Sequence, residues 1–211
     1  MAKVKHCNAL DQHGQLEQIY AVDTLELVLE STTRGVYVDD DGDKIIFNGS
    51  NLSFNGEVIV SGRLNGFKFV DSDGDTLISV TNGDWIAKAL YNALAGPNEI
   101  RGLLTASYAS KDQFQGSDKG DIIYGAGGND RLTGGKGEDW FLFGHGDGRD
   151  VVTDFDAVGG TGKQDFVRQF SNDFHMRRSG EDTIVDFGNG DTLILLDVKR
   201  SDVTLDDFMI F

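Results

Sequence analysis

The chain has 211 residues and a formal net charge of −16, from 35 acidic and 19 basic residues. A chain of this length forms one large domain or two small ones. The negative charge argues against nucleic acid and anionic membrane surfaces as partners, because both attract positively charged proteins. The single cysteine, Cys7, excludes an intrachain disulfide framework, and the sequence contains no apolar run of the about 18 residues that a membrane helix needs.

Residues 1–106 are predicted to form a β-rich domain with one helix. Residues 25–29 alternate between apolar and polar side chains, as in a half-buried strand. Residues 36–47 and 68–79 each place an Asp-Gly turn between two apolar segments, a pattern that predicts a β-hairpin. The aspartates of these turns also suggest EF-hand loops. Both segments, however, lack the central glycine and the closing glutamate of an EF-hand, so turn chemistry is the preferred interpretation.

The helix of this domain is expected over residues 84–95. Ile86 and Leu90 would lie on one apolar face, together with the alanine and leucine one turn later. Asn82 or Asp84 would cap its first turn, and the glycine and proline that follow the segment would end it.

Four aspartates lie at a constant spacing of nine residues, and each is followed two residues later by an apolar side chain. The four are Asp112, Asp121, Asp130 and Asp139. Glycine opens each of the three units between residues 116 and 142. Glycine adopts turn dihedrals without steric cost, and strand alternation would point the apolar residue inward. A glycine-rich turn, an aspartate and a short strand at this period indicate a calcium-binding parallel β-roll.

Two units complete one coil of such a roll, so aspartates 18 residues apart would lie side by side. The pairs are Asp112 with Asp130 and Asp121 with Asp139. Calcium takes about six to eight oxygen ligands, from carboxylates and main-chain carbonyls alike. A calcium ion between paired turns would relieve the repulsion among the aspartates and thereby fold the roll.

The three units, GSDKGDIIY, GAGGNDRLT and GGKGEDWFL, resemble the nonapeptide repeats of the RTX family of hemolysin-type calcium-binding proteins. The resemblance covers roughly residues 107–211. It implies a β-roll over 107–155 and a carboxy-terminal segment, 156–211, whose strands cap the open edge of the roll; within it, residues 183–198 predict a hairpin. The expected fold class is therefore mainly β, with a small β-rich domain that carries one helix followed by a short calcium-binding roll.

Carried over residue by residue, the ligand pattern of the family implies about two to four calcium ions. One ion would be held by Ser117, Lys119, Asp121, Gly134, Lys136 and Asp139. A second would be held by Tyr108, Ser110, Asp112, Gly125, Gly127 and Asp130, although residues 107–115 contain no glycine. A third would join Ala126, Gly128 and Asp130 to the degenerate stretch 143–155, where Asp150 and Asp154 are the expected acidic ligands.

The amino-terminal segment lacks the apolar core of a secretory signal peptide. The resemblance nevertheless implies an extracellular protein, because RTX proteins are exported by a type I secretion apparatus that reads an uncleaved carboxy-terminal signal. Residues 205–211, in which acidic residues precede a short apolar stretch, resemble such a signal. The roll would stay unfolded at the low calcium concentration of the cytosol and fold outside the cell.

The sequence contains no recognisable catalytic motif, since both the HExxH motif of zinc proteases and the GxSxG nucleophile elbow are missing. About 105 residues precede the repeats, which is small for a catalytic domain. We therefore expect a protein without enzymatic activity that binds a polysaccharide or a cell-surface receptor in an adhesion role. Two alternatives remain, an accessory module of a secreted polysaccharide-active enzyme and a matrix or coat protein stiffened by calcium.

Overall fold

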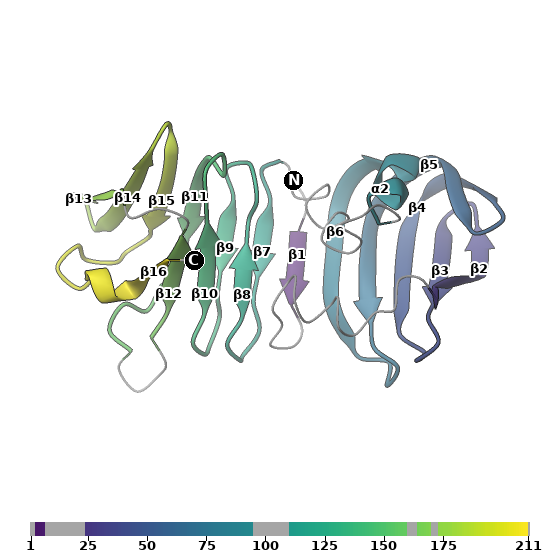
Figure 1. Cartoon of the computed structure of the whole chain (residues 1–211), viewed down its shortest axis with the longest axis horizontal. Coiled ribbons are helices and arrows are strands. Elements are labelled where there is room, and N and C mark those ends of the chain that lie inside the picture. Colours follow the sequence, from purple (N-terminus) through teal and green to yellow (C-terminus); the bar gives the residue numbers. More distant parts are fainter. Residues whose placement is uncertain (1–2, 7–23, 95–109, 160–163, 170–172, 211) are drawn as a thin grey trace. The chain divides into compact units, whose positions relative to one another are not determined.

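The computed structural model describes residues 3–6, 24–94, 110–159, 164–169 and 173–210 (Figure 1). These residues divide into two compact units, an amino-terminal unit up to residue 94 and a carboxy-terminal unit from residue 110 onward. Within the described ranges the protein is mainly β and has a single α-helix, which confirms the predicted fold class. No helix of these ranges is long and apolar enough to cross a membrane.

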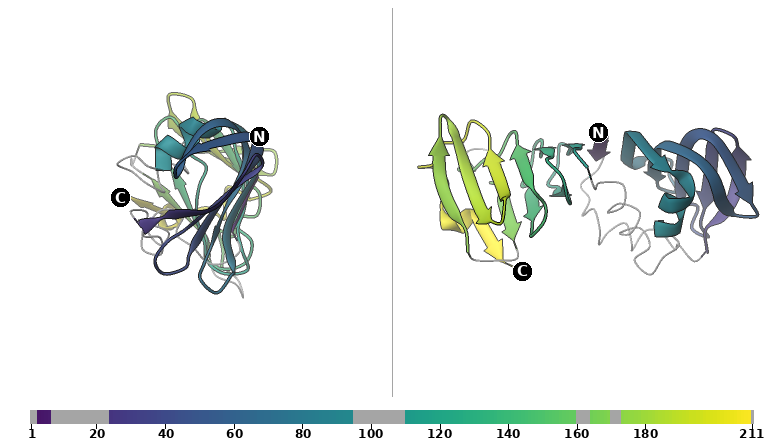
Figure 2. Two further views of the ribbon diagram at one scale, coloured as in Figure 1. Left: turned by 90° about the vertical axis from the view of Figure 1, so that its right-hand side faces the viewer. Right: turned by 90° about the horizontal axis from the view of Figure 1, so that it is seen from above.

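The amino-terminal unit is an antiparallel sheet with the strand order β1-β6-β5-β4-β3-β2. The strands are β1 (Lys3–His6), β2 (Glu26–Ser31), β3 (Arg34–Val38), β4 (Lys44–Asn55), β5 (Val58–Val70) and β6 (Thr76–Ile86). The helix α2 (Ala87–Leu94) follows β6 directly and lies over one face of this curved sheet (Figure 2).

The core of this unit lies between the sheet and α2. Alternate residues of the long central strands are fully buried, among them Phe47, Phe67 and Phe69. Helix α2 contributes Ala87 and Leu90, which are also buried. Burial of these large apolar side chains is the main source of stability here, at about 1.5 to 3 kcal/mol for each.

Both predicted hairpins are present, as β3–β4 and β5–β6. In the first turn, one carboxylate oxygen of Asp39 accepts the main-chain N–H groups of Asp41 (3.1 Å) and Asp43 (2.9 Å). In the second turn, Asp71 accepts the N–H of Asp75 at 2.8 Å. The aspartates therefore hold the turns by short-range hydrogen bonds to the main chain, as the turn interpretation predicted.

The start of the helix, the position of Ile86 and the role of Asp84 differ from the prediction. The helix begins at Ala87 rather than at residue 84, because Ile86 still pairs with Arg63 on β5 and the ladder hydrogen bonds prevail over helix propensity. Ile86 is consequently 60% exposed, and Asp84 forms an ion pair with Arg63 instead of capping the helix. Strand β2 is present as predicted, but it is an edge strand on which Leu29 is 48% exposed.

The first part of the carboxy-terminal unit consists of short parallel strands that alternate between two sheets. One sheet contains β7 (Gln113–Gln115), β9 (Arg131–Thr133) and β11 (Arg149–Val152), and the other contains β8 (Ile122–Tyr124), β10 (Trp140–Phe143) and β12 (Phe166–Gln169). Each strand thus pairs with the strand one coil further along the chain, which is the arrangement of a parallel β-roll. The apolar residue of each repeat points between the sheets and is buried, for example Ile123 and Leu132.

The end of the unit extends both sheets. Strands β13 (His175–Ser179), β14 (Asp182–Gly188) and β15 (Asp191–Leu195) form antiparallel pairs, and β15 also pairs in parallel with β11. The predicted hairpin is the β14–β15 pair. A short 3-10 turn, η2 (Leu205–Asp207), leads into β16 (Phe208–Ile210), which pairs in parallel with β12. The edges beside β11 and β12 are therefore covered by later segments of the chain.

Candidate metal centre

The turns of the roll carry a row of buried aspartates. Carboxylates are rarely buried in proteins unless they are paired or bind a cation. Six aspartates at the beginning of roll strands or directly before them are nonetheless at most 3% exposed. They are Asp112, Asp121, Asp130, Asp139, Asp150 and Asp165.

These six residues form two ladders, one beside each sheet. In each ladder a carboxylate oxygen Oδ1 accepts the main-chain N–H of the aspartate one coil earlier, at 2.7 to 2.9 Å. The first ladder is Asp112, Asp130 and Asp150, and the second is Asp121, Asp139 and Asp165. The structure thus brings together the aspartates that the nine-residue spacing paired.

The spacing within the ladders changes after the third repeat. Asp130 and Asp150 are 20 residues apart, and Asp139 and Asp165 are 26 apart, because the intervening turns are longer. Asp150 occupies the ladder position expected for it. Asp154 lies outside both ladders, since its two oxygens accept the N–H groups of Gly134 and Gly135 at 2.9 Å.

Sequence reasoning missed Asp165. An apolar residue, Val167, follows it two positions later, as in the repeats. That signal was available in the sequence. The inserted loop before Asp165 obscured it, because the nine-residue period no longer identified the position.

One ladder carboxylate has a buried oxygen whose hydrogen-bonding capacity is unused. Oδ2 of Asp130 is buried and has no hydrogen-bond partner among the described residues. A Cβ atom built on Gly125 would lie 2.8 Å from this oxygen and 3.2 Å from Oδ2 of Asp150, so both oxygens face the same glycine turn. Two carboxylates that converge on one turn, one of them with an unsatisfied oxygen, fit a divalent cation.

Main-chain carbonyls face the same turns. A Cβ atom built on Gly128 would lie 2.3 Å from the carbonyl oxygen of Ser110, and one built on Gly135 would lie 2.1 Å from that of Ser117. Both glycines also have positive φ values, +155° and +104°, which favour glycine. The close approach of consecutive coils therefore excludes any side chain at these two positions.

Of four other expected ligands, two have side chains that contact aspartates and two are glycines. Nζ of Lys136 donates to exposed Asp118 at 2.8 Å. The ammonium group has no acceptor, so only the carbonyl of Lys136 is available to a cation. Ser117 donates from Oγ to Oδ2 of Asp121 at 2.9 Å, and its carbonyl accepts the N–H of Lys136 at 3.2 Å. Gly134 lies against Oδ2 of Asp139, and Gly127 lies against the carbonyl of Gly146.

Of the remaining expected ligands, Ala126 is buried with φ +58°, and Tyr108 lies outside the described residues. Among the described residues, no group of three or more His, Cys, Asp or Glu side chains converges on a single position. A cation at these turns would therefore depend on main-chain carbonyls for most of its ligands. Calcium accepts such ligands readily.

Burial raises the pKa of four ladder aspartates, and the negative charges of their neighbours raise it further. The pKa of Asp130 rises to about 8, those of Asp139 and Asp150 to about 7, and that of Asp165 to about 6. The hydrogen bonds from main-chain N–H groups lower these pKa values but do not outweigh burial. A bound divalent cation would favour the ionised form and reverse the shift.

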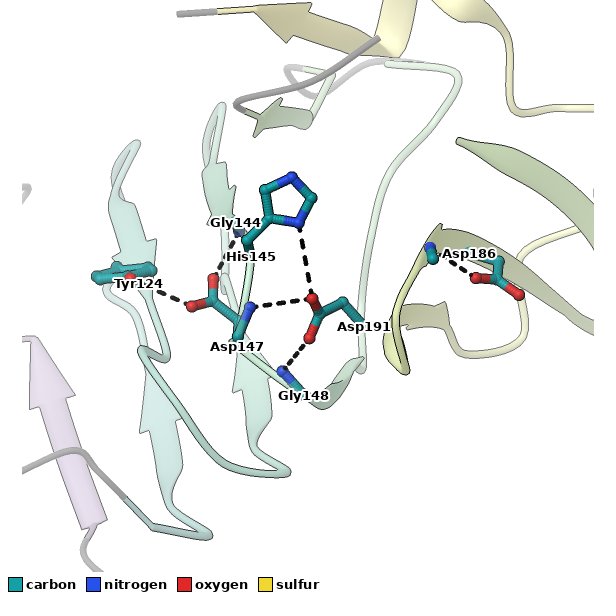
Figure 3. A network of polar contacts seen from close by, with 9 residues as sticks. Tyr124, Gly144, His145, Asp147, Gly148, Asp186 and Asp191 are labelled. Atoms are coloured by element: carbon teal, nitrogen blue, oxygen red, sulfur yellow. Dashed lines mark hydrogen bonds and ion pairs between the residues drawn. The ribbon is translucent and has the colours of Figure 1, made fainter. Parts of the chain in front are cut away.

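A second network surrounds the long turn between β10 and β11 (Figure 3). Asp147 accepts the N–H of Gly144 at 2.6 Å and the hydroxyl of Tyr124 at 3.2 Å. Asp191, the first residue of β15, accepts the N–H groups of Gly146 (2.9 Å) and Gly148 (3.0 Å). Both carboxylates are at most 5% exposed, and burial raises the pKa of Asp147 to about 6.

This network ties the β14–β15 hairpin to the third coil of the roll. His145 adds a ring nitrogen, Nδ1, 3.9 Å from Oδ2 of Asp191. Sequence reasoning missed Asp147 and Asp191. Asp147 accepts from Tyr124, 23 positions earlier, and Asp191 accepts from glycines 43 to 45 positions earlier, separations that no local period reveals. The sequence offered one signal for each residue. Asp147 ends a Gly-His-Gly-Asp segment, and Asp191 ends a Gly-Asn-Gly-Asp segment.

A parallel roll with aspartate ladders and glycine turns defines a class of calcium-binding proteins. Residues 109–141 match the family model of the RTX calcium-binding nonapeptide repeat, in four copies. This match confirms the resemblance and implies calcium binding. Repeats of this family are typical of secreted proteins and are generally non-catalytic. A comparison with curated proteins found no match to the chain.

Proposed function

We propose that this chain is a secreted calcium-binding protein that folds on calcium outside the cell and acts by binding glycans of a cell surface or an exopolysaccharide. The observation that carries the calcium part is the pair of buried aspartate ladders with the unsatisfied oxygen of Asp130. Without a cation, closing the roll brings like charges together in a medium that solvates them poorly. Calcium supplies the compensating charge, so its binding free energy becomes folding free energy.

The proposed ions lie between consecutive coils and number about two to four. Each would take one aspartate from each coil together with main-chain carbonyls of both turns. The proposed carboxylate pairs are Asp112 with Asp130, Asp121 with Asp139, Asp130 with Asp150, and Asp139 with Asp165. The proposed carbonyl donors are Tyr108, Ser110, Ser117, Lys119, Gly125, Ala126, Gly127, Gly128, Gly134 and Lys136. We propose Asp154 as an anchor of the turn at Gly134 rather than as a ligand.

The outer face of one roll sheet supports the glycan part of the proposal. Alternation along β10 and β12 places Trp140 and Phe166 on the outside, and their rings stack with centroids 4.8 Å apart. The corresponding position on the other sheet carries polar side chains, Gln113 and Arg131. Aromatic faces provide a large and rigid apolar area, which suits the apolar face of a sugar ring.

Calcium-triggered folding is tested by circular dichroism during a calcium titration, followed by chelation. We expect β-structure to increase cooperatively with calcium, to be lost on chelation and not to be restored by magnesium, which demands a stricter octahedral geometry. A spectrum that ignores both calcium and chelator would contradict the proposal.

Glycan binding is tested by retention of the calcium-loaded protein on immobilised neutral and acidic polysaccharides. Trp140→Ala should reduce retention, whereas Gln113→Ala on the other sheet should leave it unchanged. Equal retention of the two variants would remove the aromatic face from the proposal, and no retention of the unmodified protein on any polysaccharide would overturn glycan binding itself.

Type I export is proposed because residues 205–211 resemble a secretion signal. In the folded unit Asp207 is buried and β16 pairs with β12, so a transporter would have to read this segment before the roll folds. A reporter fused to residues 156–211 should leave a cell that carries a type I transporter, and a cell without the transporter should retain it. Retention in both strains would contradict this route.

A further inference from the structure

A small basic pocket lies at the end of the carboxy-terminal unit, away from the aspartate ladders. It is formed where the β13–β14 turn meets the loop that follows β15, and its volume is about 250 Å³. Its lining residues are Arg178, Gly180, Glu181, Lys199, Arg200 and Ser201. Three of these six residues are cationic in a chain whose net charge is −16.

The two arginines of the pocket are oriented by main-chain carbonyls. Nε of Arg178 donates to the carbonyl of Gly180 at 2.7 Å, and Nη1 of Arg200 donates to the carbonyl of Val203 at 2.8 Å. A neutral carbonyl fixes the direction of a guanidinium without neutralising its charge. The remaining N–H groups of each planar group stay available to a further acceptor.

The single carboxylate of the pocket lining does not cancel this charge. Oε1 of Glu181 lies 3.7 Å from Nη2 of Arg178, and the two side chains are 72% and 70% exposed. Ion pairs at such exposure are weak because water screens them. The lining side chains comprise three cations and one anion. A further carboxylate, Asp202, accepts the hydroxyl of the lining residue Ser201 at 2.9 Å, so three positive charges still outnumber two negative ones.

We propose that this pocket binds the carboxylate of an acidic sugar. Guanidinium groups bind carboxylates through two parallel hydrogen bonds, and Lys199 adds a further positive charge. The pocket is somewhat smaller than the about 300 to 1,000 Å³ of ordinary ligand pockets, so it accommodates one charged group with the ring that carries it. The inference rests on the proposed function and specifies the chemical class of glycan.

The test is a calorimetric titration of the full calcium-loaded chain with trigalacturonate. The fully methyl-esterified trigalacturonate is the matched probe, because it keeps the sugar rings and lacks their charge. We expect binding of the acid, no measurable binding of the ester, and weaker binding of the acid as sodium chloride is raised. A sulfated trisaccharide, titrated in parallel, separates recognition of carboxylates from attraction of any anion.

The double variant Lys199→Gln/Arg200→Gln should bind trigalacturonate about tenfold more weakly or worse, since charge-assisted hydrogen bonds are lost. Lys88→Gln, in the exposed part of α2, removes one charge from the other unit and should leave the affinity unchanged, as the charge-matched control for Lys199→Gln alone. Circular dichroism in calcium establishes that each variant folds, and Lys199→Gln alone provides a milder variant.

The outcomes separate the two proposals. Equal affinity of the double variant and the Lys88 variant would overturn the pocket while leaving glycan binding intact. Equal binding of the acid and the ester, or stronger binding of the sulfated sugar, would overturn the assignment to carboxylates. Retention on neutral polysaccharide without any binding of trigalacturonate would overturn this inference alone.

Discussion

Asp130 occupies a central position in the first ladder, because it accepts from the N–H of Asp112 and donates its own N–H to Asp150. Asp130→Asn removes the charge that two proposed ions share, so it should lower calcium affinity about tenfold or more. Asp112→Asn, at the start of the ladder, should cause a smaller loss. Competition with a calcium chelator measures both affinities, with Asp73→Asn in the exposed β5–β6 turn of the amino-terminal unit as the control. A loss at Asp130 no greater than that at Asp112 would contradict the proposed ion positions.

The raised pKa values predict how the calcium-free protein responds to pH. Asp130, Asp139, Asp150 and Asp165 have pKa values of about 6 to 8 in the folded state, against about 3.9 in an unfolded chain. At a pH between the unfolded-state and folded-state pKa values, the folded state binds more protons than the unfolded state. The free energy of unfolding without calcium therefore falls as pH rises from about 4 to 8.

Urea unfolding in calcium-free buffer at pH 5.0 and pH 8.0 would measure this difference. Calcium affinity should change in the opposite direction and increase with pH, because calcium and protons compete for the same carboxylates. A calcium-free roll that is more stable at the higher pH would show that the aspartates are ionised without a cation.

Gly135 combines a positive φ with close contact between coils. A Cβ atom there would lie 2.1 Å from the carbonyl of Ser117, and the φ of +104° is unfavourable for alanine. Gly135→Ala should lower stability in calcium by about 1 to 3 kcal/mol. Gly190→Ala is the matched control, because Gly190 has φ +98° and nothing within 4 Å of its Cβ position. If thermal unfolding shows equal losses for the two variants, backbone strain alone explains the effect.

At the scale of elements, Asp191 couples the β14–β15 hairpin to the turn before β11. Asn at this position would place an amide NH₂ group against one of two N–H donors, so Asp191→Asn should loosen residues 144–148. We expect a lower affinity for the ion proposed between Asp130 and Asp150, with the ion between Asp121 and Asp139 unaffected. Asp186→Asn is the control, since Asp186 accepts only from Gly188 in its own turn among the contacts in Figure 3.

Calcium titration calorimetry of the two variants would resolve the classes of site. Loss of affinity at every site in Asp191→Asn would indicate general destabilisation instead of coupling to one turn.

The sequence predicted those elements whose structure depends on residues close together in the chain. The Asp-Gly turns of both hairpins and the nine-residue period of the first roll strands follow from residues that are neighbours in sequence. The start of α2 did not, because the pairing of Ile86 with Arg63 depends on a strand more than 20 residues away. Asp165 and Asp191 were missed for a similar reason: inserted loops break the period, and only the folded chain brings these residues to the roll.

At the scale of the whole molecule, the two units differ in how they are stabilised. Both units bury large apolar side chains, such as Phe47 in the first and Phe141 in the second, but the carboxy-terminal unit also buries the six ladder aspartates. Thermal unfolding with chelator should therefore show a transition of the amino-terminal unit that calcium leaves nearly unchanged. Calcium should add or raise a second transition. Scanning calorimetry measures both, and a single transition that calcium shifts as a whole would contradict independent stabilisation.

Consecutive repeats place their strands on opposite sheets, and this alternation limits how such a roll can change in length. Insertion or deletion of one nine-residue unit would move every later strand to the other sheet. If the change came between Arg131 and Trp140, Trp140 would lie on the sheet that carries Arg131. Insertion or deletion of two units, 18 residues, keeps every later strand on its own sheet. The roll can therefore lengthen only in even steps if the aromatic side and the polar side are both to be kept, so parity of the repeat number acts as a constraint on its evolution and redesign.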